Sequence, residues 1–205
     1  MLTVWASAAR AETSHPNFEL SAGTHFMLSP VESCRNGGEG AVSCGVMRMS
    51  LGVEAATQFR LLAWLAPGLF GSWSSRSGGE IPSKLKQSQG MWRVGAQLRF
   101  TPGEWPRGMW FLLQGGAALM VETADGLVHD SGPEIHVTTT QVAPLAAAAL
   151  GWDWIFVRQL LLGAEVRCVL TAFDRHPPEL SSGILADELG SILWFSTGMR
   201  AGVVF

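Results

Sequence analysis

The residues best suited to catalysis stand together at His129, Asp130 and Ser131, with Glu134 close behind. They include a candidate base, a candidate nucleophile and two carboxylates. A Gly-Pro pair interrupts the group, however, and short polar residues around such a pair usually form a turn. The sequence therefore leaves two interpretations, a turn and a catalytic site, and favours the turn.

A second set of candidate residues is ionic rather than nucleophilic. Each of its members lies in a stretch of sequence in which apolar residues alternate with polar or small ones. They are Glu19, Arg48, Glu54, Arg93, Arg99, Glu165, Arg167 and Arg200. Alternate residues of a strand face opposite sides, so these side chains would all project from one face of a sheet. Charges of both signs on one face can pair with one another.

The alternation is clearest between Met91 and Phe100, where every second residue is apolar. A period of two is the signature of a β-strand. The same alternation recurs in four other segments, at 18–26, 47–54, 160–171 and 193–205. Three more segments, 60–73, 109–122 and 138–152, are apolar on both faces, and spacing alone indicates that they are strands.

Connections between these eight segments are alternately long and short, which predicts an all-β fold, an eight-stranded antiparallel up-and-down transmembrane β-barrel. Pro67 and Pro144 fall inside two of the strands. Proline has no N–H, and a closed barrel has no edge strand on which that loss is harmless. We therefore expect each proline to mark a bulge or a locally broken ladder.

The composition of the polar face distinguishes a membrane barrel from a soluble one. A soluble barrel carries many lysines and glutamates outside, whereas the chain's two lysines, Lys84 and Lys86, share one long connection. Small residues mixed with charges of both signs suit a narrow interior. The apolar face then meets lipid, and closure satisfies the backbone groups that lipid could not. A soluble lipocalin-like carrier, with its apolar face inward, is the alternative.

Tryptophan prefers the headgroup level of a membrane, so it should gather at strand ends. The sequence predicts two such belts, one at the long connections and one at the short ones. Their members are Trp73, Trp92 and Trp194 for the first and Trp105, Trp110, Trp152 and Trp154 for the second.

The chain's 205 residues, 47% hydrophobic and 15% charged, indicate a single domain. No run of about twenty apolar residues is present, so a helical membrane span is excluded. With a net charge of −3 and no basic stripe, nucleic acid is not an expected partner. Ala9-Arg10-Ala11 has the spacing of a secretory cleavage site, so we expect residues 1–11 to be the remnant of a secretion signal and 12–205 to form the barrel. A plain N-terminal tail fits the same residues.

Over nearly its whole length the chain resembles the small outer-membrane β-barrels of Gram-negative bacteria, with the OmpA and OmpX architecture. In that family the last strand ends in an aromatic residue preceded by apolar residues at alternate positions. Met199, Ala201, Val203 and Phe205 follow this pattern. The resemblance implies that they form an assembly signal, with the barrel assembly machinery as a transient partner and the bacterial outer membrane as location.

The resemblance also implies that both termini and the short turns near 55–59, 101–108 and 153–157 face the periplasm. Four longer loops, about 29–44, 74–90, 123–137 and 174–190, would face outward. Cys34 and Cys44 would then lie on the first loop in an oxidising compartment, where we expect them to form a disulfide. A metal pair is the alternative, but further ligands at metal-binding spacing are missing. Cys168 is expected to face lipid.

For function, the resemblance implies a structural or surface-interaction protein without cofactor or metal. The expected interior is plugged by ion pairs rather than conducting, because unpaired charges in so narrow a space would be costly. Lipid, lipopolysaccharide and a protein or ligand at the loops are the expected partners. Enzymes of this architecture act on lipid A, and His129 with Ser131 matches the His-x-Ser of lipid A deacylase barrels, although Glu134 lies too close. His25 and His176 resemble the palmitoyltransferase barrels even less.

Overall fold

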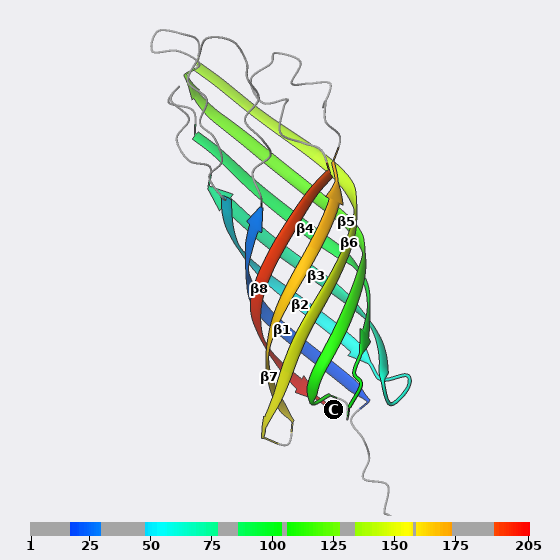
Figure 1. The fold of residues 1–205 in the computed structure, drawn as a ribbon. Coiled ribbons are helices and arrows are strands. Elements are labelled where there is room, and N and C mark those ends of the chain that lie inside the picture. The colour runs from blue at the N-terminus through cyan, green and yellow to red at the C-terminus, as the bar shows by residue number, and fades with distance from the viewer. Residues whose placement is uncertain are drawn as a thin grey trace, which may run out of the picture.

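A computed structural model describes residues 17–29, 48–77, 86–103, 106–127, 134–157, 159–173 and 191–205 of the chain. Its strands are β1 (Phe18–Ser29), β2 (Arg48–Phe59), β3 (Leu65–Ser77), β4 (Lys86–Phe100), β5 (Gly108–Leu127), β6 (Glu134–Val157), β7 (Leu160–Ala172) and β8 (Ser191–Val204). Each strand pairs antiparallel with its neighbours in sequence, and β8 pairs with β1, so the sheet closes on itself (Figure 1). The predicted eight-stranded antiparallel barrel is confirmed. The described part of the chain includes no helix with the length and apolarity that a membrane span requires.

The two faces of the barrel wall have opposite character. Large apolar side chains project outward, such as Leu69 at 65% exposure and Met199 at 72%. Charged and amide side chains project inward, and Arg99 is 0% exposed. A soluble carrier would require the reverse arrangement, because its outer face must be wet. The exterior is therefore suited to lipid, and the lipocalin-like alternative is excluded.

The strands that were apolar on both faces now have a definite register. Phe70 of β3, Ala118 of β5 and Leu145 of β6 point into the barrel, while their sequence neighbours point outward. They join an apolar cluster inside one half of the barrel. Both faces of these strands are apolar because one face meets lipid and the other meets the apolar cluster inside the barrel.

Of the two expected outcomes at the prolines, a bulge or a locally broken ladder, the bulge is not found. Pro67 pairs with Leu98 in an unshifted register, and so does Pro144 with Ala117. Between described strand pairs, the register shifts only near the end of β6, between Ile155 and Val157. Each proline instead lies where the ladder on one side of its strand has already ended.

Pro67 lies one residue beyond the last β2–β3 pair, Gln58 with Gly68. The N–H of Leu65 bonds the carbonyl of Leu62 on the β2 side, at 3.2 Å. N–H direction alternates along a strand, so Pro67 has the same orientation as Leu65. Its missing N–H therefore faces the side where no ladder bond is made.

The direction of the β6 backbone groups follows from the same reasoning. The N–H of Thr101 bonds the carbonyl of Trp64 beside β3, so the next residue back, Phe100, faces β5. Phe100 pairs with Phe111, which must face β4, and Phe111 pairs with Leu150. Leu150 therefore faces away from β5. Even-numbered residues of β6 share this direction along the unshifted β5–β6 register.

Pro144 is one of these even-numbered residues. It lies one position beyond the last β6–β7 pair at this end, Leu145 with Thr171. Its missing N–H faces the side on which β7 has ended, so the β5–β6 ladder loses nothing. A proline inside a barrel strand is tolerated when the strand is locally an edge.

Strand ends differ from the predicted turns in two places. The segment predicted as a turn at 55–59 belongs to β2, and the connection follows it at 60–64. The segment predicted as a turn at 153–157 belongs to β6, which continues to Val157. In both segments the strand therefore continues further toward the turn than the sequence predicted. The predicted turn near 101–108 lies between β4 and β5, and Gly108 there has a φ of 93°.

Of the exterior tryptophans, Trp152 and Trp154 lie near the end of β6 as predicted, whereas Trp73 and Trp92 lie within β3 and β4 rather than at their ends. Trp73 and Trp92 are ring neighbours at 6.2 Å, and Trp152 and Trp154 are exposed near the opposite end. The prediction is wrong for Trp110 and Trp194, which are buried inside the barrel. Trp194 alternates in phase with Arg200, so its inward direction was readable from the sequence. Trp105 lies outside the described residues.

Glycines let the backbones of β4 and β5 approach each other closely at the Gly95–Gly116 pair. A Cβ placed on Gly116 would lie 2.1 Å from the carbonyl oxygen of Val94 and 2.7 Å from the Cα of Gly95. A Cβ on Gly95 would lie 2.2 Å from the carbonyl oxygen of Gly115. The atoms in the way are backbone atoms, which cannot rotate aside. Glycine kinks of this kind produce curvature in a closed sheet.

The barrel is taller on one side than on the other. At the end opposite Asn17 and Phe205, here called the loop end, β4, β5 and β6 extend past β1, β7 and β8 (Figure 1). Their outer residues pair with one another, as in Asp125 with His136 and Lys86 with Asp125. We call this extension, which includes the end of β3, the protruding sheet.

Candidate functional site

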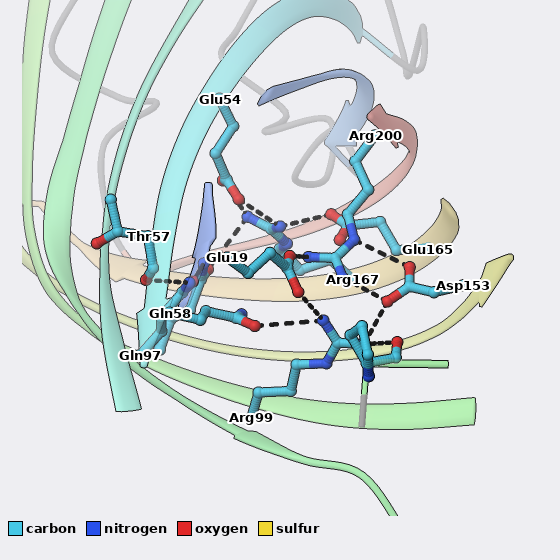
Figure 2. Close-up of polar contacts among 12 residues, drawn as sticks. Glu19, Glu54, Thr57, Gln58, Gln97, Arg99, Asp153, Glu165, Arg167 and Arg200 are labelled. Carbon is cyan, nitrogen blue, oxygen red and sulfur yellow. Dashed lines mark hydrogen bonds and ion pairs between the residues drawn. The ribbon is translucent and has the colours of Figure 1, made fainter. Parts of the chain in front are cut away.

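Four ionic side chains form a closed network inside the barrel near the end that holds Asn17 and Phe205. We call Glu19, Arg99, Asp153 and Arg200 the lower cluster. Arg99 donates from Nη1 to Oε2 of Glu19 at 2.9 Å and also pairs with Asp153 (Figure 2). Arg200 approaches Oδ2 of Asp153 at 2.5 Å and Oε1 of Glu19 at 3.2 Å. Each carboxylate thus meets two guanidinium groups, and the charges balance.

Trp110 holds both arginines of the lower cluster in place. Its ring lies 5.0 Å from the guanidinium carbon of Arg99 and 4.7 Å from that of Arg200. Such cation–π contacts add to stability where the cation is desolvated. A Cβ on Gly151 would lie 2.2 Å from this ring, so the glycine provides the space that the tryptophan occupies.

A second network, the middle cluster, consists of Glu54, Glu165 and Arg167. Arg167 donates to both oxygens of Glu54, at 2.8 Å from Nη2 to Oε1, and to Oε1 of Glu165 at 2.5 Å. It also donates to Oε1 of Gln114 at 3.1 Å, and Gln114 donates to Gln97 at 3.0 Å. The bidentate geometry is the strongest that arginine and carboxylate can form. Figure 2 shows both clusters side by side.

Arg93 completes the polar interior with uncharged partners. Its Nε donates to Oγ of Ser72 at 2.8 Å, and its Nη2 donates to Nε2 of His25 at 2.8 Å. Because His25 accepts at Nε2, its ring is neutral with the proton on Nδ1. His25, which was compared above with the palmitoyltransferase barrels, lies inside the barrel and is buried.

An apolar cap fills the interior toward the loop end. It includes Met27, Met91, Met120 and Trp194, all nearly without exposure, and the indole N–H of Trp194 donates to Oγ1 of Thr171 at 3.2 Å. Below it, a cavity of about 20 Å³ lies among polar residues that include Ser21, His25 and Glu54. That volume holds about one water molecule.

The ionic side chains of the two clusters are paired with one another. Every carboxylate of the two clusters accepts from arginine, so none is placed to act as a general base on a ligand. The described residues contain no group of three or more His, Cys, Asp and Glu side chains arranged to hold a metal ion. Two ionic layers and an apolar cap follow one another along the interior.

The structure brings seven of the eight ionic residues singled out from the sequence into the interior, and only Arg48 is not placed there. Arg48 begins β2, and its side chain is not among those described. Sequence reasoning missed Asp153, because it assigned this residue to a turn. The alternation of Trp152 and Trp154, both exposed, around a buried Asp153 was the signal that could have found it.

The remaining candidates divide by whether the structure describes them. Cys34, Cys44, His129, Asp130, Ser131 and His176 lie outside the described residues, and Glu134 begins β6 without a described side chain. Cys168 is a free thiol, half-buried, on the outward-facing side of β7. The expected assembly residues Met199, Ala201, Val203 and Phe205 share the outer face, and the Phe205 ring lies 6.3 Å from that of Phe18.

The protruding sheet has an open side along β6. β6 pairs with β5 from Glu134 onward, but with β7 only from Leu145 onward. In the part of the chain that the structure describes, residues 137–144 are therefore paired on one side only. Thr138, Thr140 and Val142 of this segment are exposed on the outer face.

No family description and no curated protein matches the sequence. Solved structures with the same fold do match. The Yersinia pestis attachment invasion locus protein Ail has a TM-score of 0.57 and 10% identity, covering 93% of this chain and 99% of its own. Ail in complex with the heparin analogue sucrose octasulfate gives a TM-score of 0.54 and 12% identity, with 92% and 99% covered. Neisserial surface protein A gives 0.53 and 11%, with 92% and 97% covered.

These similarities concern the fold. The chain has the architecture of the small outer-membrane β-barrels, as its sequence predicted. Its apolar exterior agrees with the predicted location in a bacterial outer membrane.

Proposed function

We propose that this chain is a non-catalytic outer-membrane barrel whose interior is closed and whose protruding sheet acts in interactions at the cell surface. One observation carries the proposal: β4, β5 and β6 continue past the other strands at the loop end, while ion pairs and apolar side chains fill the interior. A one-sided extension of the sheet would not help a pore to conduct. It would, however, enlarge the surface that a barrel presents outside the membrane.

The structural neighbours support a surface role by precedent. Ail is an attachment invasion locus protein, and one of its structures contains a heparin analogue, sucrose octasulfate. For the present chain we propose contact with lipopolysaccharide and with a protein or ligand at the loops. We also retain the proposed Cys34–Cys44 disulfide, which would restrain the first loop.

The proposed orientation can be tested by labelling single cysteines on intact Gram-negative cells. In a background with the three native cysteines changed to alanine, Ser88→Cys places a thiol on the exposed face of β4 at the loop end. We expect a membrane-impermeant maleimide to label it on intact cells. The matched control is Gly103→Cys in the β4–β5 turn, where an added Cβ would have no heavy atom within 4 Å. Its thiol should react only after the outer membrane is opened. The opposite pattern would reverse the orientation and remove the basis of the proposal.

A closed interior predicts that the protein does not conduct ions. In planar lipid bilayers, the refolded full chain should produce no reproducible conductance steps above the empty bilayer, because the clusters around Arg99 and Arg167 and the apolar cap leave no continuous water path. A known open porin, reconstituted identically, shows that insertion works. Steps of constant size from this protein would mean that the interior conducts.

A further inference from the structure

We infer that His25 of β1 and Arg93 of β4 form an acid-sensitive switch inside the barrel, in which a neutral histidine ring holds the arginine and a protonated ring releases it. The inference goes beyond the surface role and rests on the closed interior proposed above. Its starting point is the set of partners around Arg93. This arginine is 1% exposed, and its side chain donates to Ser72 and to His25, neither of which carries a negative charge.

The contact between the two side chains depends on a neutral ring. Nη2 of Arg93 donates to Nε2 of His25 at 2.8 Å, so this nitrogen must keep its lone pair free. A proton on Nε2 would remove the acceptor and bring two positive charges to hydrogen-bond distance. Like charges at that distance repel strongly in a buried site, because little water is present to screen them.

The ring of His25 has little room to turn away from the arginine. Its register partners on the two neighbouring strands are both glycines, Gly52 on β2 and Gly198 on β8. A Cβ on Gly52 would lie 2.2 Å from Nε2 of His25, and a Cβ on Gly198 would lie 3.2 Å from the Cβ of His25. The ring therefore occupies the space that these glycines leave. Arg93 has the longer and more flexible side chain, so it is the group that moves.

The charges around His25 leave no counter-charge for a second cation. The charged groups that act on it are Arg93 of β4, Glu54 of β2 and Arg167 of β7. Glu165 of β7 belongs to the same set, because it is paired with Arg167. Two carboxylates thus face two guanidinium groups, and Arg167 already binds both carboxylates. A proton on His25 would give this set one unmatched positive charge, which is costly in a buried site.

A water-sized cavity gives protons access to the ring. Its volume is about 20 Å³, and its lining includes His25, Glu54 and Arg200. Arg200, the charged residue of β8 on this cavity, is already paired within the lower cluster. The cavity has room for about one water molecule. Water on the polar side of the interior can therefore bring a proton to His25 without crossing the apolar cap.

Release of Arg93 would disturb the boundary between the polar interior and the apolar cap. Met91 of the cap is the next inward-facing residue of β4 toward the loop end, so the two side chains are neighbours on the inner face. A buried cation that loses its hydrogen-bond partner must be hydrated instead. The interior is thus expected to be closed at neutral pH and to loosen in acid.

The test is urea unfolding of refolded proteins in detergent micelles at about pH 7.5 and about pH 4.5. His25→Gln keeps an oxygen acceptor for Arg93 but cannot bind the proton. An unperturbed histidine has a pKa of about 6.5, so the unfolded chain takes up this proton at the lower pH, whereas the folded interior disfavours it. Acid should therefore destabilise the unaltered protein relative to His25→Gln, and the ratio of their unfolding equilibrium constants should rise at least tenfold. The matched control is His136→Gln, the same change at an exposed histidine of β6, which should follow the unaltered protein.

Arg93→Met should reverse the sign of the effect. Without this arginine, the two carboxylates of the middle cluster face Arg167 alone, so a proton on His25 restores the charge balance. The folded state then binds the proton more readily than the unfolded chain. Acid should stabilise Arg93→Met relative to the double variant Arg93→Met with His25→Gln.

Nitrogen-15 NMR of the unaltered protein with labelled histidines gives a readout that does not require Arg93→Met to fold. The signal of His25 is the one that disappears in His25→Gln, and at neutral pH it should show one protonated and one unprotonated ring nitrogen. The inference is overturned if both ring nitrogens are protonated at neutral pH, if His25→Gln has the pH dependence of the unaltered protein, or if His25 makes Arg93→Met less stable in acid. Such results would leave the labelling of Ser88→Cys and the conductance at neutral pH unchanged, so a failure here is distinct from a failure of the proposed function.

Discussion

Gly116→Ala is expected to prevent stable folding of the barrel, whereas the adjacent Gly115→Ala is expected to be tolerated. The new Cβ at position 116 would lie 2.1 Å from the carbonyl oxygen of Val94, and backbone must move to relieve the clash. Overpacking commonly costs about 1–3 kcal/mol even where side chains can adjust, so we expect a loss of about 3 kcal/mol or more here. At Gly115 no atom lies within 4 Å of a new Cβ.

The pair can be compared by urea unfolding of the refolded proteins in detergent micelles, followed by heat-modifiable gel mobility. Gly115→Ala should remain within about 0.5 kcal/mol of the unaltered protein, as surface substitutions usually do. Equal stability of the two variants would show that the backbones of β4 and β5 do not approach as closely at Gly95 and Gly116 as described.

Arg99→Met should be the most damaging substitution in the ionic interior. It removes the cation that joins Glu19 to Asp153 and leaves two carboxylates to share Arg200. Removing one partner of a buried ion pair typically costs about 3–5 kcal/mol, because a buried charge is left uncompensated. Arg107→Met, the same change at an exposed arginine, is the control and should alter the free energy of unfolding little.

A double variant separates charge balance from lost packing. Arg99→Met combined with Glu19→Gln restores neutrality in the lower cluster, because Arg200 and Asp153 remain as a pair at 2.5 Å. We expect it to be more stable than Arg99→Met alone, measured by urea unfolding as a double-mutant cycle. If Glu19→Gln brings no recovery, the cost of Arg99→Met comes from lost contacts such as that with Trp110 rather than from unbalanced charge.

The strands that could be predicted from the sequence are those with contrast between their faces. In β4, lipid-facing Val94 alternates with lumen-facing Arg93, so direction and register follow from the period of two. In β5 and β6 the lumen side carries Ala118 and Leu145, as apolar as the lipid side, and no period distinguishes the two faces. The sequence pattern does not predict strand register where the barrel interior is lined by apolar side chains.

The ion pairs themselves lay beyond sequence reasoning. Direction into the lumen was predictable for Glu54, but its partner Arg167 lies 113 positions away, and barrel register decides that contact. The open side of β6 was equally hidden, since it depends on where β7 ends relative to β6. Pro144, first read as an obstacle to a barrel strand, is the one residue in the sequence that marks this boundary.

Arg200 of β8 is paired with Glu19 of β1, across the meeting point of the first and last strands. Until those strands join, Glu19 can pair only with Arg99 and Arg200 only with Asp153, so each lacks one of its two partners in the lower cluster. The pairing of β8 with β1 therefore adds the contact that completes the network. The last ion pair of the lower cluster thus links formation of the charge network to closure of the barrel.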